Sequence, residues 1–455
     1  MRLDFGAAVV AGLVIVAGCG GGGGKSQDNG AVDTVAVSGE MSWDVEELAP
    51  LCVADTQGVA GAVAFLSDGR LCVAGGANFP GKPAAEGGKK KVYGEVYMLD
   101  GGQWGKLEGG LARPLAYAAV AYGASGAGVL ASGASEASAS RAGGLASGSS
   151  EVSASGAGAL ASGASEASAS GASVVYVLGG NDGNGSVRDA FVIRGVKEGR
   201  LVVESLPELP VATENGAAAC VGGCLYLICG QTSEGASNAV WRLRLAAAAD
   251  SDSGEPAAQW ERVADVPGPG RVQCSAAALG GNIYLAGGYN PGDGTVNASL
   301  FVYLPESDEW RFVDSLRKPE EMMTSTLVGG SLLADEEAGK LLMVGGVDAT
   351  IFQEAISRPM KMALARETGD TAFARRLERE AAEYMHHEAS WYRFSGEMTS
   401  FSVRGQEFAG EVSHPSLARA GAAVVMSDGV IYVVNGELKP GIRANTAVAL
   451  RRVRR

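Results

Sequence analysis

Short apolar runs separated by turn residues recur along the chain, and six of them end in a glycine pair or a degraded version of one. The six copies are RLCVAGGANF, VVYVLGGNDG, LYLICGQTSEG, IYLAGGYNPG, LLMVGGVDAT and IYVVNGELKPG. A run of small apolar residues and a turn precede each copy, and a further strand-like segment such as EVYML or SLFVYL follows it. A fourth segment, such as WERVADVP, begins with an aromatic residue or Leu and runs toward Pro. The pattern predicts six units of four antiparallel strands each.

The order of the fourth segments predicts how these units close into a ring. Five of them follow their glycine pairs, but after the sixth pair the chain ends at ALRRVRR. The missing segment stands near the other end, as WDVEELAP from Trp43 to Pro50. We therefore predict an all-β fold, a six-bladed kelch-type β-propeller over residues 41–455, whose N-terminal strand completes the last blade and leaves no open sheet edge.

Two stretches are longer than the repeat and predict insertions. Residues 126–170 hold three tandem units of fifteen residues rich in Ala, Ser and Gly, a composition that predicts disorder because it buries too little apolar surface to offset chain entropy. Residues 353–389 lie inside the fifth blade and place Phe373, Leu377 and Tyr384 at helical spacing with charges between them. This spacing predicts a short amphipathic helix that forms a lid or a flank.

The N-terminus predicts export and lipidation. One Arg is followed by an apolar run that ends at Gly18, and Cys19 comes directly after the small residues VAG. The run is too short to span a bilayer comfortably, so we expect residues 1–18 to be a lipoprotein signal peptide, Cys19 the lipidated residue and residues 19–40 a flexible tether. An uncleaved anchor helix is the alternative. The protein is then expected on the periplasmic side of a bacterial membrane, the outer rather than the inner one.

Composition and charge narrow the range of partners and cofactors. The chain of 455 residues carries a formal net charge of −14 and shows no stripe of Lys and Arg at helical spacing, which argues against nucleic-acid binding. The six cysteines after Cys19 match no zinc pattern, and the adjacent His386 and His387 point apart, so we expect no metal site. A disulfide from Cys220 to Cys224 or Cys229 stays open as a possibility in an oxidising compartment.

The topology predicts that one face of the propeller carries the chemistry. Strands alternate in direction within a blade, so all loops after the glycine pairs emerge on one face together with the loops that join consecutive blades. Polar residues of these loops are expected around the mouth of the central channel: Asn78, Lys82, Glu86, Lys89, Lys90, Lys91, Arg113, Asn181, Gln231, Asn290, Asp348, Glu437, Lys439 and Arg443. Amides and cations converging on a concavity suit a small polyhydroxylated anion, and the predicted substrate-binding residues are Asn78, Lys89, Lys90, Arg113 and Lys439.

Several segments of this face carry a family resemblance. GVAGAVAFLSDGRLCVAGGANFP, EGGKKKVYGEVYML, GGVDATIFQEAI and VNGELKPGIR resemble the N-acetylneuraminate epimerase family, the sialic acid mutarotases, and the order of the segments is similar to its cyclically permuted branch. The tandem repeat and the third glycine pair, which reads Cys229 and Gly230, depart from the family pattern. The resemblance implies conversion of the α-anomer of sialic acid to the β-anomer, with Glu437 and Arg443 as the catalytic pair.

The chemistry of anomer exchange fits such a pair. A base must take the proton of the anomeric hydroxyl and an acid must protonate the ring oxygen as the ring opens, and such assistance typically supplies about 100-fold to 10,000-fold. Glu437 is the expected proton shuttle, and Arg443 can hold the sugar carboxylate. No cofactor is required. The alternative function is a non-catalytic kelch propeller that binds a glycan or a protein; a sialidase is disfavoured because its repeated Ser-x-Asp-x-Gly-x-Thr-Trp turns are absent from the sequence.

Overall fold

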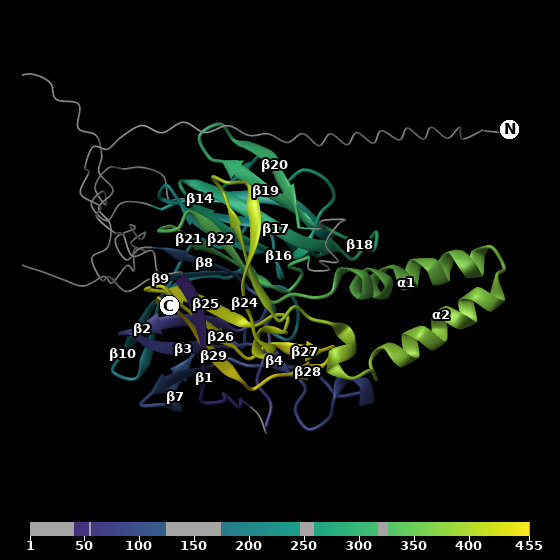
Figure 1. The fold of residues 1–455 in the computed structure, drawn as a ribbon, viewed down its shortest axis with the longest axis horizontal. Helices are drawn as coiled ribbons and strands as arrows, with labels where there is room; N and C mark the ends of the chain where they lie inside the picture. The colour runs from purple at the N-terminus through teal and green to yellow at the C-terminus, as the bar shows by residue number, and fades with distance from the viewer. Residues whose placement is uncertain (1–40, 54–55, 124–173, 246–258, 317–325, 455) are drawn as a thin grey trace, which may run out of the picture. The chain divides into compact units, whose positions relative to one another are not determined.

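The computed structural model describes residues 41–53, 56–123, 174–245, 259–316 and 326–454. Within these ranges the chain folds into six antiparallel sheets of four strands in series, one of them with an added short strand, and two further two-stranded ribbons (Figure 1). The predictions for residues 1–18, Cys19, residues 19–40 and residues 126–170 lie outside the described residues.

The first three blades follow one another along the chain. Blade 1 contains β2 (Val63–Ser67), β3 (Arg70–Ala74), β6 (Glu95–Asp100) and β7 (Gln103–Gly110). Blade 2 contains β8 (Ala119–Gly123), β9 (Val174–Leu178), β10 (Ala190–Lys197) and β11 (Arg200–Ser205). Blade 3 contains β12 (Ala217–Val221), β13 (Cys224–Thr232), β14 (Gly235–Arg244) and β15 (Trp260–Val263). A ribbon of β4 (Ala77–Asn78) and β5 (Lys91–Val92), with the short helix η1 (Ala84–Glu86) between them, extends from blade 1.

The last three blades complete the ring. Blade 4 contains β16 (Val272–Leu279), β17 (Asn282–Asn290), β19 (Ser299–Leu304) and β20 (Glu309–Ser315), with β18 (Thr295–Val296) paired to β17. Blade 5 contains β21 (Ser331–Asp335), β22 (Lys340–Val344), β23 (Glu397–Ser402) and β24 (Glu407–Ser413). Blade 6 contains β25 (Ala423–Ser427), β26 (Val430–Val434), β29 (Ala447–Arg454) and β1 (Met41–Leu48), and η3 (Pro415–Leu417) leads into it.

The predicted closure by the N-terminal strand is confirmed. β1 pairs with β29 over eight residues, from Met41 opposite Arg454 to Leu48 opposite Ala447. The same blade then contacts blade 5 through β1 and β24, and blade 1 through β25 and β2. The chain therefore forms a closed six-bladed propeller in which the last blade takes strands from both ends of the described chain.

Glycine recurs at these pairs because the backbones of neighbouring blades come close to each other there. At Gly75, the first glycine of blade 1, φ is +70° and an added Cβ would lie 2.3 Å from the carbonyl oxygen of Leu115, so only glycine fits. The degraded pairs keep the left-handed backbone with other residues, at Cys229 (φ 60°) and Asn435 (φ 57°). The repeat is therefore preserved in the backbone where the sequence has drifted.

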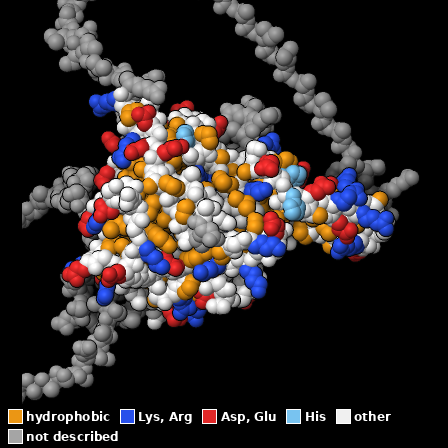
Figure 2. All heavy atoms as spheres, turned by 90° about the horizontal axis from the view of Figure 1, so that it is seen from below, with side chains coloured by type: hydrophobic (Ala, Val, Ile, Leu, Met, Phe, Trp, Pro, Cys, Tyr) orange, Lys and Arg blue, Asp and Glu red, His pale blue; other side chains and the backbone are white. Residues whose placement is uncertain are grey.

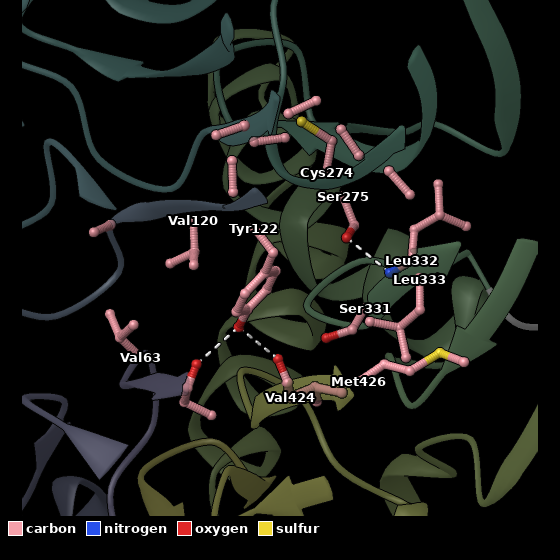
Figure 3. Close-up of a pocket in the computed structure, with 18 of the residues that line it drawn as sticks. Val63, Val120, Tyr122, Cys274, Ser275, Ser331, Leu332, Leu333, Val424 and Met426 are labelled. Carbon is pink, nitrogen blue, oxygen red and sulfur yellow. Dashed lines mark hydrogen bonds between the residues drawn. The ribbon is translucent and has the colours of Figure 1, made fainter. Parts of the chain in front are cut away.

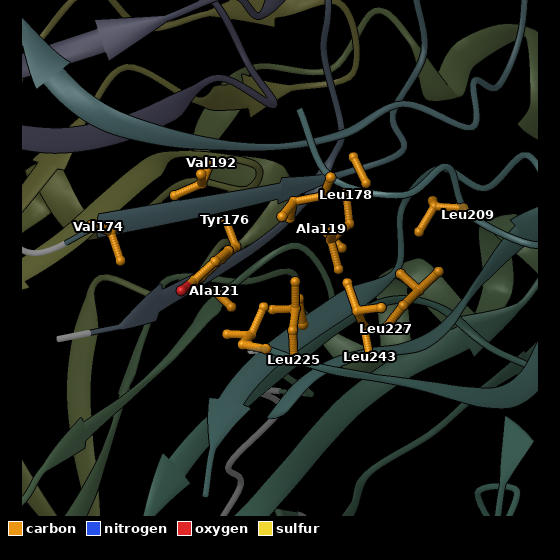
Figure 4. Close-up of a cluster of buried hydrophobic side chains, with 14 residues drawn as sticks. Ala119, Ala121, Val174, Tyr176, Leu178, Val192, Leu209, Leu225, Leu227 and Leu243 are labelled. Atoms are coloured by element: carbon orange, nitrogen blue, oxygen red, sulfur yellow. The ribbon is translucent and has the colours of Figure 1, made fainter. Parts of the chain in front are cut away.

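The hydrophobic core lies between neighbouring blades. In one cluster, Tyr176 and Leu178 of blade 2 pack against Leu225, Leu227 and Leu243 of blade 3, all of them buried (Figure 4). The alternation of inward and outward residues along each strand supplies both faces of every blade with such side chains. Each blade is thus stabilised by its two neighbours, which makes the ring a single cooperative unit.

The aromatic residues that begin the fourth segments join the blades at their outer rim. Three indole N–H groups donate to backbone carbonyls of the preceding blade: Trp104 to Ala49 at 2.8 Å, Trp260 to Pro207 at 2.9 Å and Trp310 to Ala264 at 2.9 Å. Trp43 of β1 makes an equivalent bond, but to a side chain: its Nε1 donates to the Glu411 carboxylate of blade 5 at 3.0 Å. The N-terminal strand is therefore attached to its neighbour like the other outer strands.

Two helices occupy the insertion predicted in the fifth blade. α1 (Ala349–Glu367) begins four residues before the predicted boundary at residue 353, because Asp348 caps it by accepting from the backbone N–H groups of Thr350 and Ile351 at 2.9 Å each. α2 (Thr371–Tyr384) packs against α1, and η2 (Ala389–Tyr392) follows (Figure 1). The sequence predicted only the second helix. None of the helices within the described ranges is long and apolar enough to cross a membrane.

Candidate functional site

The segment NGELKPGIR forms a small hairpin at the end of the inner strands of blade 6. β27 (Glu437–Lys439) pairs with β28 (Ile442–Arg443), and the register sets Glu437 opposite Arg443. Arg443 Nη1 donates a short hydrogen bond to Glu437 Oε1, and the backbone N–H of Gly441 donates to the same oxygen at 2.8 Å. The two residues implied as a catalytic pair therefore form an ion pair, with side chains 4% exposed for Arg443 and 27% exposed for Glu437.

Blade 1 holds the guanidinium group of Arg443 in place. Its Nε donates to the carbonyl oxygen of Ala77 at 3.3 Å, and its guanidinium carbon lies 5.5 Å from the centre of the Phe79 ring. Burial by itself would lower the pKa of Arg443, but the net shift is upward because the Glu437 carboxylate and the Tyr117 hydroxyl stabilise the charged form. Arg443 is thus a fixed, permanently charged group that faces blades 1 and 6 at once.

Three tyrosines from distant parts of the chain form a wall beside Glu437. They are Tyr289 at the end of β17, Tyr384 at the end of α2 and Tyr392 in η2. Burial raises the pKa of each, to about 12 for Tyr384, and the nearby Glu437 carboxylate adds to the rise. These phenols therefore stay neutral near pH 7, and the hydroxyl of the buried Tyr392 donates to the carbonyl oxygen of Tyr384.

The helical insertion is fastened over this wall at several points. Gln353 of α1 accepts from the backbone N–H of Val296 at 2.9 Å and donates to the carbonyl oxygen of Gly294, which attaches the helix to blade 4. On the other side Lys439 Nζ donates to the carbonyl oxygen of His387 at 2.6 Å. The insertion therefore bridges blades 4 and 6 and encloses the site from one side.

The other predicted substrate-binding residues take different positions. Asn78 is fully buried: its Oδ1 accepts from the Tyr93 hydroxyl at 2.7 Å and its Nδ2 donates to the carbonyl oxygen of Gly58 at 2.9 Å. The Asn78 amide thus holds the β4–β5 ribbon to the propeller, and its part in substrate binding stays a prediction. Lys439 is likewise engaged in fastening the insertion.

The basic residues around blade 1 divide into two groups. Arg113 lies 2.9 Å from Asp189 and 3.8 Å from Asp182, and its side chain is 49% exposed, so it belongs to a surface ion-pair network. Lys89 and Lys90 are both exposed, and the ammonium group of Lys90 lies 5.1 Å from the centre of the ring of Tyr117, a residue that lies beside Arg443. Of these cations, Lys90 is therefore the one placed near the ion pair.

A ring of six backbone hydrogen bonds, here called the mouth ring, was not predicted from the sequence. Each blade within the described residues contributes one residue at or just before the start of its innermost strand, and all six residues have φ between 52° and 68°. The bonds run from Gly61 N to Gly421 O (2.8 Å), Tyr117 N to Gly61 O (2.8 Å), Asn215 N to Tyr117 O (2.8 Å), Gln273 N to Asn215 O (2.8 Å), Gly329 N to Gln273 O (3.3 Å) and Gly421 N to Gly329 O (2.6 Å). Every N–H and C=O of the mouth ring is used, so the bonds point one way around the channel.

Behind the mouth ring, the innermost strands enclose a cavity of about 320 Å³. Its walls are largely small side chains, with Tyr122 as the largest of them. The Tyr122 hydroxyl lies 3.0 Å from the carbonyl oxygen of Ala64 and 2.9 Å from that of Val424, and so joins blade 2 to blades 1 and 6 (Figure 3). The side chains that line the cavity are mostly small and apolar. The charged pair lies outside this lining, where the backbone of Glu437 exchanges hydrogen bonds with that of Ala420 beside the mouth ring.

The described residues show no donor set for a metal ion. Their His, Cys, Asp and Glu side chains nowhere form a group of three that could hold one, and Cys220, Cys224 and Cys229 are free thiols. Figure 2 shows acidic and basic side chains interspersed on the face that it displays. The charged groups at the centre of the candidate site are the Glu437 carboxylate and the Arg443 guanidinium group.

Over little more than half its length, the chain is similar in sequence to proteins of one family. A family model described as N-acetylneuraminate epimerase matches residues 206–452. N-acetylneuraminate epimerase of Pasteurella multocida is 32% identical over 244 residues, which are 52% of this chain and 56% of that protein. The protein of the same name from Brucella melitensis is 27% identical over 252 residues, 54% of this chain and 58% of that protein. The chain thus spans little more than half the length of these curated relatives.

A solved structure, that of YjhT, is 26% identical and covers 52% of this chain and 62% of its own, with a TM-score of 0.42. The matched residues 206–452 contain blades 3 to 5, most of blade 6, the helical insertion and the hairpin with Glu437 and Arg443. The family model covers more than half of the chain, and the chain belongs to the N-acetylneuraminate epimerase family.

Proposed function

We propose that this protein is a sialic acid mutarotase that interconverts the α and β anomers of N-acetylneuraminate by opening and reclosing the sugar ring. The observation that carries the proposal is the Glu437–Arg443 ion pair, which lies beside the mouth ring within the residues matched by the family model. The names of the relatives support the substrate class. No cofactor is needed, because ring opening is neither a redox reaction nor a group transfer.

Glu437 is placed to act on the anomeric hydroxyl. Both hydrogen bonds that the described residues donate to its carboxylate end on Oε1, so Oε2 is the oxygen turned to a substrate. Oε2 takes the proton of the anomeric hydroxyl as the bond between the anomeric carbon and the ring oxygen breaks, the ring oxygen gains a proton from an acid in the site, and an open-chain keto acid forms. After rotation of the carbonyl group, the proton returns when the ring closes on the opposite face.

Arg443 is placed to bind the carboxylate of the sugar. A guanidinium group has five N–H donors, and Glu437 and Ala77 engage one on Nη1 and the one on Nε. The remaining donors and the positive charge attract the carboxylate and hold the anomeric carbon beside Glu437. Because Arg443 is buried and paired, this orientation exists before substrate arrives, which reduces the entropic cost of reaching the reactive geometry.

The two residues are expected to fail differently when they are substituted. Glu437→Gln keeps the acceptor for Arg443 and Gly441 but cannot shuttle a proton, so we expect kcat to fall about 100-fold to 10,000-fold while sugar binding changes little. Arg443→Lys keeps the charge but loses the planar fork, so we expect mainly weaker binding, by about 1.5–3 kcal/mol. Exchange NMR on freshly released α-anomer measures the rate, and calorimetry measures the affinity.

Glu86→Gln provides the matched control, because Glu86 is an exposed carboxylate in η1 on the same face and outside the ion pair. It is expected to exchange anomers at the wild-type rate. A wild-type protein that binds the sugar and leaves the spontaneous rate unchanged would be the non-catalytic propeller instead. Wild-type rates in Glu437→Gln would remove the carboxylate from the mechanism.

The proposed location is the periplasmic side of a bacterial membrane, with lipid attached at Cys19. The support is in the sequence, where an apolar run ending in VAG precedes Cys19 and a glycine-rich stretch follows it. Metabolic labelling with a radioactive fatty acid should mark the wild-type chain and leave Cys19→Ala unlabelled. Equal labelling of both chains would place the lipid elsewhere or exclude this anchor.

A further inference from the structure

Anomer exchange moves two protons, and the ion pair accounts for one of them. As the ring opens, the anomeric hydroxyl loses a proton and the ring oxygen gains one; reclosure reverses both transfers. Glu437 can accept the first proton, but Arg443 remains charged at any physiological pH and cannot donate the second. A second side chain with an exchangeable proton is therefore expected on the Arg443 side of the site.

Tyr117 lies on that side. Its ring packs against the small cluster of Ala77, Val92 and Ala116, and the carbonyl oxygen of Ala77 is the group that receives Arg443 Nε. The Lys90 ammonium group lies 5.1 Å from the centre of the Tyr117 ring. The phenol is only partly buried, so it is accessible to a small ligand at the mouth of the channel.

The backbone of Tyr117 is held in an unusual conformation. Its φ is 59°, in the left-handed region that non-glycine residues rarely adopt, and three of the other five mouth-ring positions are glycine. Its N–H donates to Gly61 and its C=O accepts from Asn215, both at 2.8 Å, so two neighbouring blades hold it. Such strain of about 1–3 kcal/mol persists where the surroundings over-determine the backbone, and it is concentrated at functional sites.

Arg443 lies beside the Tyr117 hydroxyl, which is one of the groups that raise the pKa of Arg443. The ammonium group of Lys90 lies over the ring of the same tyrosine. The three wall tyrosines differ, because the Glu437 carboxylate adds to the rise in the pKa of each and the Tyr392 hydroxyl already donates to the carbonyl oxygen of Tyr384. Tyr117 is therefore the tyrosine on the Arg443 side of the site.

We propose that Tyr117 is the second proton-transfer residue of the site, donating its O–H proton to the ring oxygen while Glu437 takes the anomeric proton. The inference rests on the proposed mutarotase function. As the ring opens, the O–H bond of Tyr117 breaks and the new O–H bond forms on the sugar ring oxygen; Arg443 and Lys90 stabilise the transient phenolate. On reclosure the phenolate recovers its proton from the same hydroxyl, so no other reactant is consumed.

The test substitutes Tyr117→Phe, which keeps the ring against its cluster and removes only the hydroxyl. We expect kcat for anomer exchange to fall about 100-fold or more, with KM within about threefold of wild type and an almost unchanged melting temperature. Tyr93→Phe is the matched control: Tyr93 also has a lysine above its ring, Lys91 at 4.8 Å, but its hydroxyl binds the buried Asn78. This control is expected to lose stability and retain kcat.

The outcomes separate the inference from the function on which it rests. A wild-type protein that accelerates exchange, together with a Tyr117→Phe variant within threefold of its kcat, would overturn the role of Tyr117 and leave the mutarotase proposal intact. Equal losses of kcat and melting temperature in Tyr117→Phe and Tyr93→Phe would show a structural role only. A wild-type protein that does not accelerate exchange would overturn both proposals.

Discussion

Truncation of the Trp43 side chain should weaken the closure of the propeller more than any comparable change at another blade junction. Trp43 is 6% exposed and packs into the core between blades 5 and 6, its Nε1 donates to Glu411 at 3.0 Å, and the Arg452 guanidinium lies 4.9 Å from its ring centre. A buried tryptophan removes about 150–250 Å² from water, which at about 25 cal/mol per Å² corresponds to about 4–6 kcal/mol. The lost indole bond adds little, since Lys340 at 3.0 Å still pairs with Glu411.

We therefore expect Trp43→Ala to lose about 4–6 kcal/mol of unfolding free energy, a large part of the about 5–15 kcal/mol that folded domains possess. Trp43→Phe keeps most of the apolar area and should lose about 1–2 kcal/mol, because the smaller ring buries less surface. Urea unfolding followed by circular dichroism measures both values. The matched control is Trp310→Ala, which removes an indole bond of 2.9 Å between blades 3 and 4.

Hydrogen exchange distinguishes closure from general packing. Within the described residues, β1 is hydrogen-bonded to the propeller through β29 on one edge, so its amides and those of β29 should exchange faster in Trp43→Ala before the whole protein unfolds. In Trp310→Ala the altered strand continues into the fold at both ends, and β1 should keep its protection. A loss below about 1 kcal/mol in Trp43→Ala, or equal exchange of β29 in the two variants, would refute the closure argument.

Two further predictions follow from the rim and from the mouth ring. The pKa of Glu411 lies below its ordinary value of 4.5, because the nearby Ser400 hydroxyl and the bonds from Lys340 and Trp43 together outweigh burial. Its stabilising effect is therefore present above pH 4.5 and is lost as the pH falls through the lowered folded-state value. Glu411→Gln should be less stable than wild type at pH 7 and nearly equal to it near pH 3 in urea titrations, and a constant difference across that range would contradict this. Gly61→Ala should lower stability and reduce kcat, because the new Cβ would lie 2.4 Å from Tyr117 Cδ1. Gly69→Ala is its control: its φ of +73° carries a similar backbone strain, but its Cβ would have no atom within 4 Å, so Gly61→Ala should be the more destabilised of the two. Similar melting temperatures and exchange rates for the two glycine variants would show that the Tyr117 side chain can shift without loss of stability or activity.

The amino-acid sequence by itself determined the six-bladed ring, its closure by the strand beginning near Trp43, and the placement of Glu437 and Arg443 on one loop. These features depend on periodicity and on neighbours along the chain: turns, glycine pairs and alternating apolar residues act within ten to fifteen positions. The first insertion helix was missed because α1 carries only a weak amphipathic pattern and Pro359 lies within it. Its start at Ala349 depends on the cap supplied by Asp348.

Only the tertiary structure decided which polar groups face the site. In the sequence, Asn78 is a polar residue on the predicted face of the propeller. In the structure its side-chain amide is hydrogen-bonded to the Tyr93 hydroxyl and to the carbonyl oxygen of Gly58. Tyr117 looks like an ordinary core residue in sequence, and its left-handed backbone arises from hydrogen bonds to Gly61 and Asn215, in blades 1 and 3. A side chain's role depends on partners tens to hundreds of residues away, and closing the ring is the physical step that brings those partners together.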